Sequence, residues 1–133
     1  MSVSDILKDL GVDGSAHAAP IDGPGIGYRS DTLVSPASVA KVQVALAVEH
    51  AIASGRIDGK QLRILPPQRR TPGPVGVSLL RDEVRMSVRD LVTMMLTISD
   101  NVATDELIAL AGLAQINDLT DGLGLTSTRL TLT

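Results

Sequence analysis

Apolar residues recur with helical spacing over most of the chain, and two short apolar-rich stretches precede them near the amino terminus. Residues 2–10 have the pattern of a short amphipathic helix, with Ser2 or Ser4 as its cap and Gly11 as its terminator. The run Asp-Gly-Pro-Gly in the middle of residues 15–29 is a strong turn signal. The flanking stretches therefore predict a β-hairpin.

Residues 36–54 place apolar side chains on nearly every face, which is typical of a buried helix. Pro36 suits the first helical turn, with Ser35 available as the cap and Gly55 after the end. Lys41 is the anomaly in this helix, because burial of an ammonium group is costly unless the group is paired or gives up its proton. The alternative is that its side chain reaches solvent near the helix end.

The carboxy-terminal half of the chain is mainly helical in pattern. Residues 65–76 contain four prolines and two glycines, which predict a loop. A capping-box-like start predicts a helix over residues 87–96. After a short polar break, a second helix runs to Gly112 and a third covers residues 113–123. Residues 125–133 alternate threonine with apolar residues and predict a strand or an extended loop.

Composition excludes several classes of function. The chain has no cysteine, which removes thiol chemistry and disulfides, and Tyr28 is its only aromatic residue, which argues against stacking on nucleic-acid bases. A net charge of -3 argues against nucleic-acid or membrane partners. His17 and His50 are too isolated to predict a metal site, so we expect no metal or cofactor. Residues 56–89 carry eight basic and three acidic residues, which indicates a solvated basic surface or an anion-binding patch.

Two short motifs carry the candidate chemistry. Ser38 and Lys41 form Ser-x-x-Lys, which puts a hydroxyl and an amine about one helical turn apart on one face and so can activate a serine. This pair arises by chance in roughly one such chain in four, which leaves a plain helix start open. The run Ser99-Asp100-Asn101 is rarer, at roughly one chain in seventy, although these residue types also suit a helix junction.

Together the two motifs resemble the signature of class A β-lactamases and penicillin-binding-type serine hydrolases. Residues 27–41 resemble the strand that leads into the nucleophile helix of this family. Residues 86–104 resemble the helix and loop that carry its second motif, and residues 123–125 resemble the turn before its Ω loop. The resemblance therefore extends over nearly all of the chain.

The resemblance implies an α+β fold that is predominantly helical. We expect the helical domain of a β-lactamase-like fold plus an N-terminal β-hairpin, without the C-terminal strands of the sheet. One incomplete domain would then cover residues 1–133. Its parts would be an N-terminal helix and hairpin in residues 1–34, a helical region in residues 35–125 and the start of the Ω-loop region in residues 126–133.

The resemblance also implies roles for particular residues. Ser38 would attack the carbonyl of a β-lactam or a related amide or ester and form an acyl-serine, with its own backbone N–H as one oxyanion donor. Lys41 would act as the base, and Ser99 would relay the proton to the leaving nitrogen. Asn101 would orient Lys41 or the substrate amide. Asp100 would hold the loop and take no part in the chemistry.

Two further parts of the family's machinery are not found in the sequence. Lys-Thr-Gly does not occur, and the Ω-loop glutamate is expected just beyond Thr133. We therefore expect impaired turnover, and the alternative is a non-catalytic fragment or interaction module that retains the fold. We also expect self-association or pairing with a missing C-terminal half. The chain as written lacks a signal-peptide pattern, which predicts a cytoplasmic protein, although the family is commonly exported.

Overall fold

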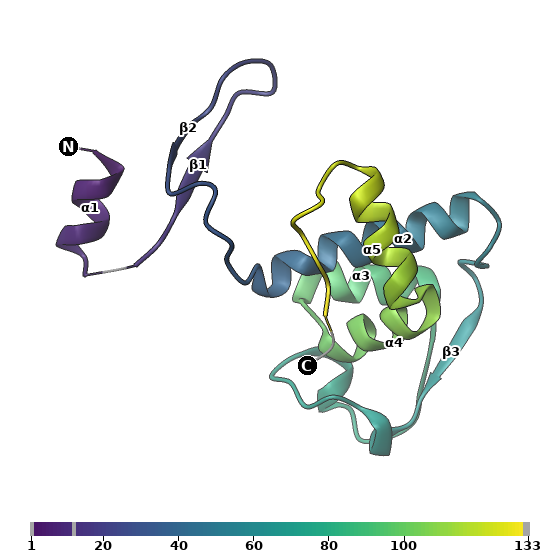
Figure 1. Ribbon diagram of the computed structural model, residues 1–133. Coiled ribbons are helices and arrows are strands. Elements are labelled where there is room, and N and C mark those ends of the chain that lie inside the picture. The colour runs from purple at the N-terminus through teal and green to yellow at the C-terminus, as the bar shows by residue number, and fades with distance from the viewer. Residues whose placement is uncertain (1, 12, 132–133) are drawn as a thin grey trace. The chain divides into compact units, whose positions relative to one another are not determined.

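The chain forms two compact units, Met1–Ser35 and Pro36–Thr133, in the computed structural model (Figure 1). The structure describes residues 2–11 and 13–131. It consists mainly of helices, with two small antiparallel sheets, so the predicted α+β fold class is confirmed. No helix within the described ranges is long and apolar enough to cross a membrane.

The first unit contains α1 (Val3–Asp9) and a hairpin of β1 (Ala16–Ala18) and β2 (Ile26–Tyr28). The Ser2 N–H donates to the Asp5 carboxylate at 2.8 Å, and the Asp5 N–H donates to the Ser2 hydroxyl at 3.2 Å. Hydrogen bonds from the backbone and then the side chain of Ser2 hold the pKa of Asp5 below its usual range. The predicted helix and hairpin are confirmed, with shorter strands than expected.

Four α-helices make up most of the second unit. They are α2 (Lys41–Ala53), α3 (Val88–Ile98), α4 (Asn101–Ala111) and α5 (Leu113–Gly122). Their apolar faces meet in one core, whose fully covered side chains include Val44, Val48, Leu91, Leu107 and Ile116. Ser87 caps α3 by accepting a hydrogen bond from the Asp90 N–H at 3.2 Å. The three helices predicted after residue 86 are therefore confirmed.

The start of α2 differs from the prediction. Ala37–Ala40 form a 3₁₀ turn, η1, and Ser35 is not a cap, because neither η1 nor α2 has a side-chain cap. Ala37 has a φ of 47°, in the left-handed region, where a right-handed helix cannot pass. The α-helix begins at Lys41, three residues after Ser38.

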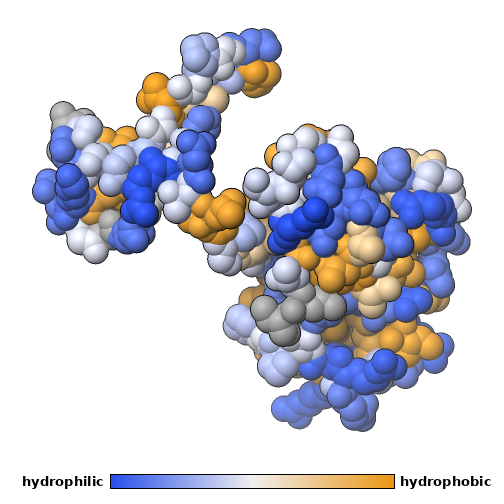
Figure 2. Space-filling model, in the orientation of Figure 1, coloured by the Kyte–Doolittle hydropathy of each residue, from blue (hydrophilic) through white to orange (hydrophobic). Residues whose placement is uncertain are grey.

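One side of α2 lies open, which its composition did not predict. Val44 and Val48 are fully buried, whereas Val42 and Leu46 are 50% and 47% exposed. Residues four apart lie on one face of a helix, so Val44 and Val48 form one face of α2. Val42 and Leu46 form the opposite face. Burial on every side is therefore wrong for α2, and apolar surface on this unit is visible in Figure 2.

An antiparallel pair of strands in the second unit was not predicted. β3 (Leu62–Leu65) pairs with β4 (Val84–Ser87), and the connection contains the 3₁₀ turns η2 (Pro67–Arg69) and η3 (Gly76–Leu79). The guanidinium of Arg70 holds this connection together, because it donates to four carbonyl oxygens along it at 2.5–3.2 Å. These oxygens belong to Leu65, Val77, Leu80 and Asp82.

The chain after α5 contains turns and no strand through residue 131. Of the two predictions for residues 125–133, the extended loop therefore holds for the described part, and residues 132 and 133 lie outside the described residues. This segment returns to η1, because Leu130 lines the same pocket as Ser38.

Candidate active site

Lys41 is the centre of a cluster of polar atoms. The residue is 8% exposed, and its Nζ lies 2.7 Å from the Ser99 carbonyl oxygen, 2.8 Å from Ser99 Oγ and 2.8 Å from Asn101 Oδ1. Ser38 Oγ is 3.5 Å from the same nitrogen. The alternative of a lysine that reaches solvent is therefore wrong. All four predicted site residues meet, although Lys41 and Ser99 are 58 positions apart.

The close partners of Lys41 are all neutral oxygen atoms. The Ser99 carbonyl and the Asn101 amide oxygen only accept hydrogen bonds, so they occupy two N–H groups of Lys41 in either protonation state. The third close partner is the Ser99 hydroxyl oxygen, which accepts from Lys41 while its own hydrogen is donated to Ser38 Oγ. The ion pairs within residues 2–11 and 13–131 do not involve Lys41.

Ser99 connects the amine to Ser38. Its hydroxyl donates to Ser38 Oγ at 2.9 Å and lies 2.8 Å from Lys41 Nζ. When rotation of the two hydroxyls reverses both hydrogen bonds, the proton of Ser38 has a route to Lys41 through Ser99, besides the longer direct contact of 3.5 Å. The cluster can therefore take a proton from one serine hydroxyl and deliver it through the other.

The backbone of Ser99 has an unusual conformation that directs both of its oxygens to Lys41. Ser99 ends α3 with φ 61° and ψ 36°, in the left-handed region, which is uncommon for a residue other than glycine. Such a conformation costs about 1–3 kcal/mol and persists only where its surroundings favour it. Here the Lys41 ammonium or amine binds the Ser99 carbonyl and hydroxyl together.

Asp100 fixes the junction between α3 and α4. It is fully buried, and its carboxylate accepts from the Ala103 N–H at 3.1 Å and from the Val77 N–H at 2.7 Å. The first bond caps α4, and the second attaches η3 to the junction. Gly76 makes this approach feasible, since a Cβ there would lie 2.1 Å from the carboxylate. The prediction that Asp100 holds the loop is confirmed.

Ser38 and Lys41 open onto a pocket of about 310 Å³. Its lining residues are Ala37, Ser38, Ala40, Lys41, Val44, Asn101, Thr104 and Leu130. Sequence reasoning did not identify Thr104 or Leu130. Thr104 lies one helical turn after Asp100 and was detectable in principle, whereas nothing in the sequence connects Leu130 to Ser38.

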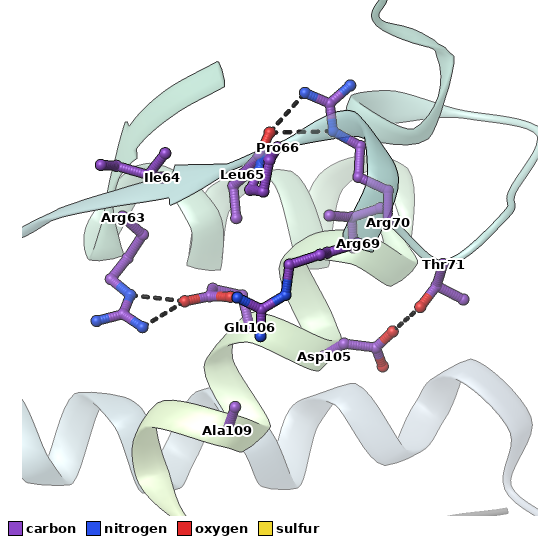
Figure 3. Close-up of a pocket in the computed structure, with 11 residues that line it drawn as sticks. Arg63, Ile64, Leu65, Pro66, Arg69, Arg70, Thr71, Asp105, Glu106 and Ala109 are labelled. Carbon is purple, nitrogen blue, oxygen red and sulfur yellow. Dashed lines mark hydrogen bonds and ion pairs between the residues drawn. The ribbon is translucent and has the colours of Figure 1, made fainter. Parts of the chain in front are cut away.

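A second pocket, of about 280 Å³, lies between β3, η2 and α4 (Figure 3). Three residues of the basic segment line it: Arg63, Arg69 and Arg70. Arg63 forms an ion pair with Glu106 at 2.6 Å, and Thr71 donates to Asp105. Arg70 is bound to backbone carbonyls. Arg63 and Arg70 therefore hold the fold together, and their charges are already paired or bound. Arg69 also lines this pocket, so the solvated surface and the anion-binding patch both stay predictions for residues 56–89.

Neither histidine is a hydrogen-bond partner of Lys41 or a lining residue of the pocket at Ser38. His17 lies in β1, and His50 lies in the last turn of α2. In the part of the chain that the structure describes, no group of three or more His, Asp or Glu side chains is arranged to hold a metal ion.

Comparison with known proteins places this geometry in context. Residues 4–132 match the model of the "Beta-lactamase enzyme family". The chain is 33% identical over 117 residues to the "Beta-lactamase regulatory protein BlaB" of Streptomyces cacaoi. The matched residues make up 86% of this chain and 38% of that protein.

Two solved structures are similar over nearly the whole chain. The beta-lactamase from Sphaerobacter thermophilus DSM 20745 has a TM-score of 0.87 and 29% identity, covering 98% of this chain and 49% of that one. An ancestral class A beta-lactamase has a TM-score of 0.82 and 26% identity, covering 98% and 50%. The chain thus spans about half the length of these structures.

Proposed function

The chain belongs to the beta-lactamase enzyme family, and from this premise we propose that it carries the nucleophile half of a serine hydrolase that acts through an acyl-serine. The substrates proposed are β-lactams or related amides and esters. The observation that supports this most strongly is the position of Ser99 Oγ, 2.8 Å from Lys41 Nζ and 2.9 Å from Ser38 Oγ.

The proposed reaction starts from the neutral amine of Lys41. Ser38 Oγ bonds to the substrate carbonyl carbon while its proton passes to Lys41, directly or through the Ser99 hydroxyl. The bond from carbon to the leaving nitrogen or oxygen then breaks, and the leaving atom takes the proton through Ser99. Asn101 keeps Lys41 in place through its amide oxygen and has an N–H₂ group left to bind the substrate.

We expect these 133 residues alone to acylate slowly. They contain no Lys-Thr-Gly, and the Ser38 backbone N–H is the only oxyanion donor that we assign. Loss of one such donor typically lowers the rate ~10²–10³-fold. We also assign no carboxylate of the cluster to the activation of a hydrolytic water. An acyl group on Ser38 should therefore persist once it forms.

Intact-mass measurement after incubation with benzylpenicillin tests the proposal. An increase by the mass of the penicillin is expected for the parent chain and for Ser15→Ala, an exposed serine of the first unit. Ser38→Ala should show no increase. An equal adduct on Ser38→Ala, or none on the parent chain, removes the proposed acyl transfer.

A second candidate function is a binding module without acyl transfer. The similarity to a protein named as a beta-lactamase regulatory protein favours it. The pocket at Ser38 would then bind its ligand reversibly. Calorimetry distinguishes the two, because reversible binding of benzylpenicillin that survives Ser38→Ala, without any adduct, supports the module.

We also propose that the chain self-associates or pairs with a partner that supplies the rest of the fold. Two observations support this proposal: the matched structures are about twice as long, and Val42 and Leu46 expose apolar surface on α2. Sedimentation velocity over a range of concentrations tests it, with Leu46→Lys expected to weaken association. A single monomer that unfolds cooperatively in dilute solution contradicts the proposal.

A further inference from the structure

One side chain attaches the segment after α5 to that helix. Asn117 Nδ2 donates to the Leu130 carbonyl oxygen at 3.0 Å, and the Leu130 N–H donates to Asn117 Oδ1 at 2.9 Å. One carboxamide thus satisfies both backbone groups of Leu130, as a neighbouring strand would. Nearby, Arg129 and Asp121 form an ion pair at 2.9 Å.

Leu130 is also part of the pocket at Ser38. Its side chain is partly buried, packs against the hydrophobic core and lines the pocket together with Ser38, Lys41 and Asn101. Half of the lining residues are apolar, and Leu130 is the largest of these. The others are Ala37, Ala40 and Val44. The backbone position of Leu130 therefore decides how much apolar surface the pocket offers.

We propose that Asn117 is a positioning residue that holds Leu130 as an apolar wall of the Ser38 pocket. This wall favours acyl groups that carry an aromatic or aliphatic substituent next to the reacting carbonyl. The inference rests on the proposed function, because it specifies the substrate preference of the same site.

A substituent against Leu130 removes apolar surface from water, and contacts of this size discriminate between substrates by roughly tenfold or more. Without Asn117, the segment keeps the core contact of the Leu130 side chain, which does not fix its backbone, and the Arg129–Asp121 pair, whose side chains are 52% and 33% exposed. Such partly exposed pairs contribute little, so the wall would lose its fixed position.

Amide hydrogen exchange in the full chain tests the attachment without requiring activity. The Leu130 N–H should exchange at least about tenfold faster in Asn117→Ala than in the parent chain, because its acceptor is removed. Asp118→Ala, an exposed neighbour on α5, should leave this exchange unchanged. Equal protection of Leu130 in the parent chain and in Asn117→Ala overturns the proposal.

Ligand binding in a Ser38→Ala background tests the wall without acylation. N-phenylacetylglycine should bind about tenfold more tightly than N-acetylglycine, and this ratio should approach one in Asn117→Ala and Leu130→Ala. Leu119→Ala, which removes core packing from the same helix, should keep the ratio and so controls for a loss of stability. If the chain with Ser38→Ala alone shows no preference for N-phenylacetylglycine, the proposal that Leu130 forms an apolar wall is wrong.

Benzylpenicillin adduct formation on the parent chain reports on the proposed function separately. A missing adduct with a protected Leu130 and an intact preference rejects the acyl transfer and leaves the role of Asn117 standing. If the parent chain forms an adduct but Asn117→Ala does not change the exchange rate of the Leu130 N–H, the positioning role of Asn117 is rejected and the acyl transfer stands.

Discussion

The two units of the chain differ in how far their own residues cover their apolar side chains. Among the described residues of Met1–Ser35 none is buried, and Ile6 in α1 is 40% exposed. In Pro36–Thr133 four helices share one core around Leu91 and Leu107, which are fully covered. The cap of α1, the hairpin hydrogen bonds and the Arg29–Asp13 ion pair hold the first unit together, whereas packing between helices holds the second.

The candidate site lies wholly in the unit that has its own core. Lys41 begins α2, Ser99 ends α3, and Asn101 begins α4. Because the bodies of these helices pack together, their ends are placed within hydrogen-bonding distance of one another. A site with this geometry thus depends on the core. By contrast, a helix with a capping box and a hairpin with three-residue strands are only marginally stable without neighbouring elements.

The largest expected difference between the units concerns core truncation. Leu91→Ala should lower the free energy of unfolding by about 2–5 kcal/mol, because it leaves a cavity in the shared core. Ile6→Ala in α1 should lower it by less than about 1 kcal/mol, because the side chain is already partly exposed. Urea titrations followed by circular dichroism measure both, and equal losses would contradict the contrast.

A matched pair of lysines separates the units by chemistry. Lys41→Ala should slow formation of the benzylpenicillin adduct by about 10²-fold or more, because the base is removed. Lys8→Ala on the exposed side of α1 should leave the rate unchanged. Time-resolved intact mass gives both rates. A similar slowing in Lys8→Ala would show that the first unit takes part in the reaction.

Two glycines with positive φ, one in each unit, differ in what an added side chain would contact. Gly76 has φ 72° and Gly11 has φ 63°, so alanine is strained at both. Only at Gly76 does a new Cβ meet another group, the Asp100 carboxylate, and displace it from its two amide donors. Gly76→Ala should therefore lower the free energy of unfolding by about 1–3 kcal/mol more than Gly11→Ala, measured by urea titration.

The smallest expected effect is the acid response of α1. The pKa of Asp5 is lowered in the folded chain, so its stabilising contribution is present above the unfolded pKa of about 3.9 and is lost as the pH falls through the folded value. Hydrogen exchange of the α1 amides should therefore speed up relative to the intrinsic rate below about pH 4. Asp5→Asn should remove this dependence, because the titrating carboxyl is gone, and a dependence that persists in Asp5→Asn would contradict it.

Local features were predictable because they depend on residues close in sequence. The Ser2 and Ser87 caps, the break at Asp100 and the helices on either side of it all rest on contacts within four positions. The strands β3 and β4 were not predicted, because eighteen residues separate them and a single arginine, Arg70, organises the connection.

The sequence by itself determined the five α-helices, apart from the start of α2, the residue types of the site and, through two motifs, the resemblance to a family. Only the tertiary structure decided that Lys41 is enclosed by Ser99 and Asn101, that Ala37 adopts a left-handed conformation before Ser38, and that Asn117 brings Leu130 to the pocket. The physical reason is distance along the chain. Helix caps and periodicity act over one turn, whereas the surroundings of Lys41 depend on how three packed helices place their ends.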